Sequence, residues 1–190
     1  MTLVSVIIAT YNRANSLKKL LSDFSLQAVN SQFNFEVIVV DNNSADQTKA
    51  VVESFIEHSP GRFVYLFEKR QGKSIALNSG IQKAKGDILV FTDDDVHPDP
   101  GWLKNIVECF LQNECDGVGG KVVAQFPKDT PAWIKNNADL MQGAVVFYDY
   151  GDDILRFDKS MYEFIGANQA FRKEVFLDCG FYRTDIGPGH

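Results

Sequence analysis

The sequence predicts an α/β fold in which a mostly parallel central sheet is covered by helices. Four short apolar runs have the length and composition of buried strands, and each is followed by a segment with apolar residues at helical spacing. Strands that alternate with helices of about 10–15 residues form right-handed βαβ crossovers and hence parallel sheets. Ligands of such sheets bind outside the carboxyl ends of the strands, so the residues after each strand are the candidate site.

The first strand and helix lie at the N-terminus. Residues 4–9, VSVIIA, form a nearly continuous apolar run, which is typical of a strand covered on both faces. In residues 13–24 the apolar side chains fall on one helical face: Leu17, Leu20, Leu21 and Phe24. Thr10, Tyr11 and Asn12 therefore follow the strand and precede the helix.

A second strand is expected at residues 35–41, FEVIVVD. Ser44 and Gln47 have the spacing of a capping box, so we expect the next helix to begin near them. Asp41 is an alternative cap for the same helix. The helix has an apolar stripe and stops at Pro60-Gly61; the stripe consists of Val51, Val52, Phe55 and Ile56.

Two more strands follow, at residues 62–68 and 87–92. The helix between them starts near Gly72 and is expected to end at Gly86. Asp99-Pro100 has the composition of a further helix start. The apolar face of that last helix is interpreted as core packing; it consists of Trp102, Leu103, Ile106, Val107 and Phe110.

Three consecutive carboxylates, Asp93, Asp94 and Asp95, follow the fourth strand. At the end of a buried strand they would repel one another unless a positive charge lies among them. Mg²⁺ or Mn²⁺ prefers oxygen ligands and commonly bridges a carboxylate and phosphate oxygens, which would relieve the repulsion. In extended geometry Asp93 and Asp95 would face the ligand while Asp94 turns aside. The alternative is a solvated acidic turn before the next helix.

Composition limits the class of protein. The 190 residues are 45% hydrophobic, enough for one substantial core, so a single domain is expected. The net charge of −6 argues against a nucleic-acid-binding surface. Three cysteines without CxxC spacing disfavour a disulfide framework, and His58, His97 and His190 form no metal-ligand pattern. No signal peptide or membrane-span pattern occurs, which predicts a cytoplasmic protein, with peripheral attachment to the inner face of the membrane left open.

Four stretches together resemble a known family, the inverting family 2 glycosyltransferases with a GT-A fold. In order they are VSVIIATYNRANSLKKLL, FEVIVVDNNSADQT, EKRQGKSIALNSGIQKAKGDILVFTDDDVHPDPGWL and GANQAFRKEVFLDCGFY. They cover most of residues 1–182, whereas about 122–164 carries little that matches. The resemblance implies a Rossmann-like three-layer sandwich over residues 1–190, with a donor-nucleotide half at about 1–100 and an acceptor-side half at about 101–190.

The resemblance also implies roles for individual residues. Thr10, Tyr11 and Asp41 would hold the nucleotide base, and Asp95 with Asp93 would ligate the divalent cation as a DXD motif. The full set implied to bind the nucleotide or donor is Thr10, Tyr11, Asn12, Arg13, Asp41, Asn43, Arg70, Lys73, Asp93 and Asp94. The sugar and acceptor pocket would be formed by Gly166, Ala167 and Asn168. Asn42-Asn43 departs from the Asp-Gly that many members have after the second strand.

The activity implied is inverting transfer of a sugar from a nucleotide-diphosphate sugar, UDP-sugar first, to a hydroxyl of a saccharide or lipid-linked acceptor. Family members use this chemistry in cell-surface polysaccharide biosynthesis. Their catalytic base is an Asp in an acidic pair after the GFY-type segment. Here Asp185 is the only carboxylate after Phe181, which makes Asp185 the candidate. We expect the chain to be an N-terminal donor-binding portion of a longer enzyme, with the true base farther on.

The sequence leaves two other classes of function open. The first is a non-catalytic nucleotide-sugar-binding module or an inactive fragment, which turnover of a nucleotide sugar would distinguish from an enzyme. The second is a nicotinamide-dependent oxidoreductase. It is disfavoured because the first strand ends in ATYNRAN rather than in a GxGxxG phosphate loop.

Overall fold

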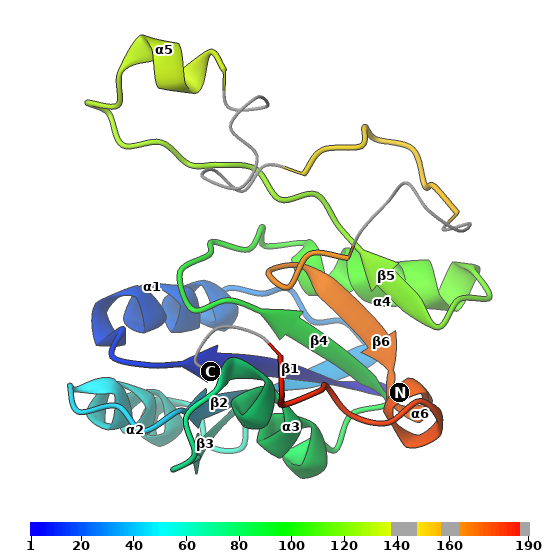
Figure 1. Cartoon of the computed structure of the whole chain (residues 1–190). Coiled ribbons are helices and arrows are strands. Elements are labelled where there is room, and N and C mark those ends of the chain that lie inside the picture. Colours follow the sequence, from blue (N-terminus) through cyan, green and yellow to red (C-terminus); the bar gives the residue numbers. More distant parts are fainter. Residues whose placement is uncertain (138–147, 157–163, 187–190) are drawn as a thin grey trace.

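The structure is a computed structural model that describes residues 1–137, 148–156 and 164–186 (Figure 1). Within these ranges a sheet of six strands has the order β3-β2-β1-β4-β6-β5. Four strands are parallel: β1 (Thr2–Thr10), β2 (Phe33–Asp41), β3 (Phe63–Phe67) and β4 (Ile88–Thr92). Two pair antiparallel: β6 (Gln169–Arg172) with β4, and β5 (Gly117–Gly119) with β6. The predicted α/β class with a mostly parallel sheet is confirmed.

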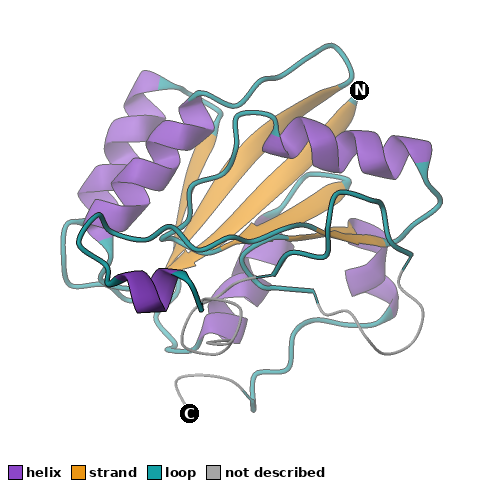
Figure 2. Cartoon of the chain, turned by 90° about the horizontal axis from the view of Figure 1, so that it is seen from above, coloured by secondary structure: helices purple, strands orange, loops and turns teal. Residues whose placement is uncertain are grey.

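Helices cover both faces of the sheet, which confirms the three-layer arrangement (Figures 1 and 2). One face packs against α1 (Ala14–Ser25), α2 (Thr48–His58) and α4 (Trp102–Gln112). The other face packs against α3 (Lys73–Lys83) and α6 (Lys173–Asp178). The short α5 (Ala132–Lys135) lies in the projecting segment, the part of the chain that follows β5 and extends away from the sheet (Figure 1).

The core follows from the apolar periodicity of each element. Val6 and Ile8 of β1 point to the layer of α1, while Ile7 between them points to α3, because successive strand side chains alternate faces. The predicted apolar face of α1 is buried, and so is that of α4 except for Trp102, which packs partly buried against the core. In α2 only part of the predicted stripe is fully buried, at Val52, and its other members pack partly buried against the same core. Both faces are therefore filled, as the continuous apolar strands predicted.

One expected helix cap and one expected helix end were wrong. Helix α2 begins at Thr48, where the Asp46 carboxylate accepts the Thr48 amide at 3.0 Å, so neither the Ser44–Gln47 box nor Asp41 caps it. Helix α3 ends at Lys83 rather than at Gly86. Gly86 instead permits a close approach to β1, because a Cβ there would lie 2.5 Å from the Ser5 nitrogen.

Helix α3 lies close to β1 because Gly80 has no side chain. A Cβ at Gly80 would meet the Ile7 side chain at 2.5 Å. We expect Gly80→Ala to lower the free energy of unfolding by about 1–3 kcal/mol, since overpacking a filled core forces side chains and backbone to move. The measurement is urea denaturation, with Gln82→Ala on the exposed side of α3 as the matched control. A Gly80→Ala protein as stable as the control would contradict this packing.

Strand register brings the predicted site residues to one edge. Thr10 lies opposite Asp41, and Asp41 lies opposite Phe67, so β1, β2 and β3 end together. Thr92 at the end of β4 pairs with Ile8, two residues before Thr10. The aspartates that follow Thr92 are therefore carried to the level of Thr10.

None of the helices in the described ranges is both long and apolar enough to cross a bilayer. In the projecting segment Val122 and Tyr148 form an antiparallel bridge, with Val122 N–H donating to Tyr148 O at 2.9 Å. Parts of the poorly matched stretch 122–164, and His190, lie outside the described residues. The proposed division into two halves near residue 100 stays a prediction.

Candidate functional site

The aspartate run is joined to β1 through Asp94. This residue is 7% exposed, and its carboxylate accepts a 2.7 Å hydrogen bond from the hydroxyl of Thr10, which is also buried. Burial raises the pKa of Asp94, while the Thr10 hydroxyl and the nearby Arg13 favour its charged form. Asp94 thus turns toward Thr10 and fixes the aspartates against the end of β1.

Side-chain cations relieve the repulsion that the sequence predicts. The Arg13 guanidinium donates to the Asp95 carboxylate and lies 3.6 Å from Asp94, and the Lys73 ammonium donates to Asp93. The hydrogen bond to Asp95 raises the pKa of Arg13. Arg13 precedes α1 and Lys73 begins α3, so helices on opposite faces of the sheet each supply one positive charge. The structure therefore brings Arg13, Lys73 and all three aspartates together.

Asp41 lines a cleft of about 550 Å³, together with Ser44, Ala45, Asp46, Lys49, Tyr65 and Phe67. This size lies within the range of small-molecule sites, about 300–1,000 Å³. Asp41 is 2% exposed; one carboxylate oxygen accepts the Ser44 amide at 2.8 Å and the other accepts the Tyr65 hydroxyl at 2.8 Å. Each oxygen keeps a further lone pair, so Asp41 can still accept a hydrogen bond from a ligand.

A second, smaller cavity of about 240 Å³ adjoins the first. It is lined by Asn12, Arg13, Ala14, Asn15, Ser16 and Asp46, and Asp46 borders both cavities. Asn12 has φ of 53° and accepts the Ala45 amide through its side chain at 2.8 Å, and Asn43 has φ of 70°. Asparagine tolerates this left-handed conformation better than most residues. Tyr11 is 51% exposed beside this turn.

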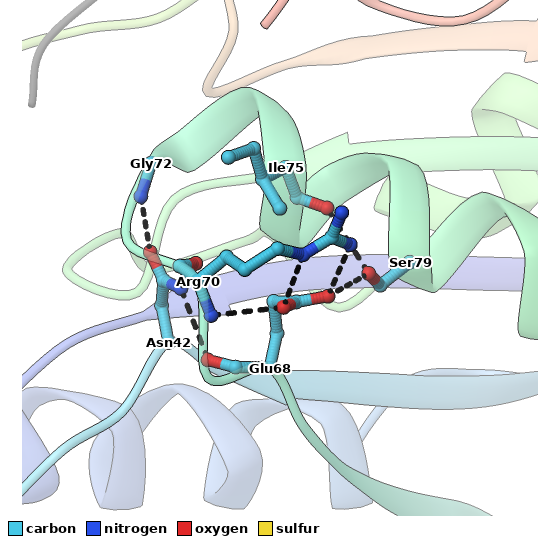
Figure 3. Close-up of polar contacts among 6 residues, drawn as sticks. All are labelled: Asn42, Glu68, Arg70, Gly72, Ile75 and Ser79. Atoms are coloured by element: carbon cyan, nitrogen blue, oxygen red, sulfur yellow. Dashed lines mark hydrogen bonds and ion pairs between the residues drawn. The ribbon is translucent and has the colours of Figure 1, made fainter. Parts of the chain in front are cut away.

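Arg70 has a different setting from the other predicted cations (Figure 3). Its Nε and Nη2 donate to the two carboxylate oxygens of Glu68, each at 3.0 Å, and Ser79 donates to the same carboxylate at 2.6 Å. The bond to Arg70, followed by that to Ser79, lowers the pKa of Glu68 to about 2. Among the described contacts Arg70 thus pairs with Glu68, not with the aspartate run.

Of the residues predicted to form the sugar pocket, Gly166 and Ala167 lie near the aspartate run, whereas the Asn168 side chain has other partners. Thr92 donates to the Ala167 carbonyl at 2.9 Å, and a Cβ at Gly166 would lie 3.9 Å from the Lys73 ammonium. The Asn168 side chain, however, accepts from the Trp102 indole and donates to the Lys121 carbonyl, each at 2.9 Å. Asn168 therefore connects α4 to the projecting segment, and a hydrogen bond to a sugar would have to share these atoms.

Asp185, the candidate base, is exposed after α6. The Arg183 guanidinium binds its two carboxylate oxygens at 3.0 and 2.5 Å. This fork-like pairing is a charge-assisted ion pair, and its hydrogen bond raises the pKa of Arg183. The catalytic role of Asp185 stays a prediction.

The donor set fits a cation bound together with phosphate groups. Within the described ranges no group of three or more His, Cys, Asp or Glu side chains is arranged to hold a metal ion. Mg²⁺ and Mn²⁺ at nucleotide sites need only one or two carboxylates, because phosphates and water supply the other oxygens. Asp95 and Asp93 are 51% and 33% exposed at their side chains, so both can reach such a cation.

Sequence reasoning missed several residues that shape the site. Tyr65 and Phe67 lie in β3 with the period-two pattern of a strand, and nothing in that pattern indicated that both line the cleft. Burial, followed by the hydrogen bond to Asp41, raises the pKa of Tyr65. Asn42 was noted only as a departure from the family pattern, yet it is 5% exposed and bound on several sides.

A mostly parallel sheet with a cleft and a carboxylate cluster at the carboxyl ends of its strands defines an α/β protein with a candidate small-molecule site at that edge. The sequence model of glycosyl transferase family 2 matches residues 5–180. The chain belongs to this family, which confirms the resemblance, and the fold is the GT-A fold of the solved structures that it matches.

Similar proteins include a glycosyltransferase, AglE, of Haloferax volcanii, 36% identical over 65% of this chain and 40% of its own length. A dolichol-phosphate mannosyltransferase of Pyrococcus furiosus is 31% identical over 63% of this chain and 33% of its own length. A mannosyltransferase of Pyrobaculum calidifontis, solved with GDP-Man and Mn²⁺, has a TM-score of 0.69 at 26% identity, covering 97% of this chain and 48% of that one. The chain thus spans about half the length of such relatives, or less.

Proposed function

We propose that the chain forms the donor-binding part of a glycosyltransferase that takes a sugar from a nucleotide-diphosphate sugar. The observation that carries the proposal is one edge of the sheet, where Asp41 at the end of β2 lines a cleft and the aspartate run after β4 pairs with Arg13 and Lys73. The Pyrobaculum calidifontis mannosyltransferase, solved with GDP-Man and Mn²⁺, supports the choice of ligand.

In this proposal the nucleotide base enters the cleft between Asp41 and the aromatic side chains of Tyr65 and Phe67. Asp41 accepts a hydrogen bond from the base, and the rings offer apolar surface to it. UDP is the first choice of nucleotide, and GDP is the second. The Asn12–Arg13 turn, which borders the adjoining cavity, contacts the remainder of the nucleotide.

The diphosphate lies near Asp93, Asp95, Arg13 and Lys73. When a divalent cation is bound there with Asp95, it supplies charge stabilisation to the leaving diphosphate. Arg13 and Lys73 can exchange their carboxylate partners for phosphate oxygens, because both side chains are about half exposed. The acceptor hydroxyl attacks the anomeric carbon in line from the opposite side, which inverts it, and a general base takes the proton.

The acceptor side is proposed to lie toward Gly166 and Ala167, next to Lys73. Several similar proteins are named for lipid-linked substrates, among them an undecaprenyl-phosphate 4-deoxy-4-formamido-L-arabinose transferase of Pseudomonas savastanoi. A saccharide or polyprenyl-phosphate acceptor is proposed for this protein by analogy. Peripheral attachment at the inner face of a membrane would follow from a lipid-linked acceptor.

The function is tested by titrating UDP, GDP and their sugar conjugates, each with Mn²⁺, and recording the shift in thermal midpoint. We expect one nucleotide family to stabilise the protein, because a ligand that binds only the folded state raises its stability. Release of nucleoside diphosphate from the best donor, in the presence of a polyprenyl phosphate, then separates a transferase from a non-catalytic binding module. Failure of every nucleotide to shift the midpoint would contradict the proposal.

A further inference from the structure

Asn42 lies directly after β2 and has an unusually complete set of hydrogen bonds. Its side-chain oxygen accepts the Gly72 amide at 2.9 Å, and its side-chain amide donates to the carbonyls of Arg70 at 2.6 Å and Glu68 at 3.2 Å (Figure 3). The residue is 5% exposed. One buried side chain therefore joins three backbone groups of the loop that connects β3 to α3.

The backbone of Asn42 is also fixed on both sides. Its N–H donates to the Thr10 carbonyl at 2.8 Å, which continues the pairing of β2 with β1. Its carbonyl accepts from the Gln71 side chain at 2.7 Å. Asn42 cannot shift without disturbing the strand ends, so the loop is held against a rigid part of the sheet.

The loop needs such an anchor because it leaves the sheet. The last hydrogen bond between β2 and the chain leaving β3 runs from the Glu68 amide to the Asp41 carbonyl, at 2.9 Å. Gly72 then takes φ of 134°, a conformation that L side chains rarely adopt, and α3 begins at the next residue, Lys73. The position of Lys73 opposite Asp93 thus depends on how Gly72 is held.

We propose that Asn42 is a positioning residue that sets the start of α3, and with it the Lys73 ammonium, for contact with the diphosphate of the donor. The inference rests on the proposed nucleotide-sugar function. With the contacts of this chain an amide is needed, because the Asn42 side chain donates to two carbonyls and accepts from one amide at once. An aspartate of the same shape would direct a carboxylate at the two carbonyl oxygens and could donate to neither.

The test is Asn42→Asp, with uridine and UDP titrated separately by NMR in the presence of Mg²⁺. The affinity for uridine reports on the base cleft. The additional affinity of UDP over uridine reports on the contacts to the diphosphate. We expect UDP affinity to fall about 10- to 100-fold and uridine affinity to change less than about threefold, because the loop spends less time in its competent position. Hydrogen exchange of the Gly72 amide should become faster, while amides of β1 stay protected.

Gln47→Glu is the control, since it introduces the same amide-to-carboxylate change at an exposed position before α2. Asn42→Ala is the second variant, and it should reproduce the loss for UDP without the added charge. Equal losses for uridine and UDP would overturn the inference in favour of a general structural role, as would unchanged UDP affinity. Absence of UDP binding in the unmodified protein would instead contradict the proposed function itself.

Discussion

Asp41→Ala is expected to weaken UDP binding by about 1–3 kcal/mol, roughly five- to 150-fold, because the base would lose its acceptor in a buried site. Asp41 lines the cleft and is 2% exposed, so the loss of its carboxylate leaves the base without a partner in a buried place. The measurement is isothermal titration of UDP into the folded variant, with circular dichroism to verify the fold.

Two further variants separate base recognition from local packing. Tyr65→Phe removes the hydroxyl that donates to Asp41 at 2.8 Å but leaves the carboxylate in place. Asp178→Asn changes an exposed carboxylate at the end of α6 and should bind UDP normally. If Asp41→Ala binds UDP as tightly as Asp178→Asn does, Asp41 only orders the turn that reaches Ser44.

The parallel half of the sheet was predictable because its signals are local. The runs that form β1, β2 and β4 are continuous and apolar, and the following helices have regular apolar faces. Strands β5 and β6 were not predicted. They have three and four residues, too few to give a period. Strand β6 pairs antiparallel with β4 across a separation of about eighty residues, and β5 pairs antiparallel with β6.

The site could be predicted as a location but not as a set of contacts. The rule that ligands bind at the carboxyl ends of parallel strands placed Thr10, Asp41 and the aspartate run together. It could not show that Arg13 pairs with Asp95 while Arg70 turns to Glu68, because long cationic side chains reach several partners from one backbone position. The role of Asn42 depends on carbonyls 26 and 28 residues farther along the chain.

The pKa shifts of Glu68 and Asp94 could not be predicted from the sequence either. Both are carboxylates near strand ends, yet the pKa of Glu68 is lowered by Arg70 and Ser79 whereas burial raises that of Asp94. The two pKa values shift in opposite directions because the groups around each carboxylate come from parts of the chain that meet only in the folded protein. A carboxylate in the sequence therefore indicates a candidate, and its partners determine which charge state the fold favours.

Asp95→Asn is expected to abolish the enhancement of UDP binding by Mn²⁺ and to lower sugar transfer by at least about 10²-fold, since the proposed cation supplies several kcal/mol of charge stabilisation. Asp95 is the most exposed of the three aspartates, at 51% for its side chain, and its described partner is the half-exposed Arg13 rather than a buried hydroxyl. It can therefore exchange that partner for a cation without disturbing the bond between Thr10 and Asp94.

The measurement is a pair of UDP titrations, with and without Mn²⁺, for the unmodified protein, Asp95→Asn and the control Asp178→Asn. The control should keep the full enhancement because Asp178 ends α6, and α6 begins at the amino end of β4, away from the aspartate run, where Lys173 N–H donates to the Asp87 carbonyl at 2.9 Å. Mn²⁺ enhancement of equal size in all three proteins would remove Asp95 from the cation site. Asp93, which pairs with Lys73 and is partly exposed, would then be the next carboxylate to test.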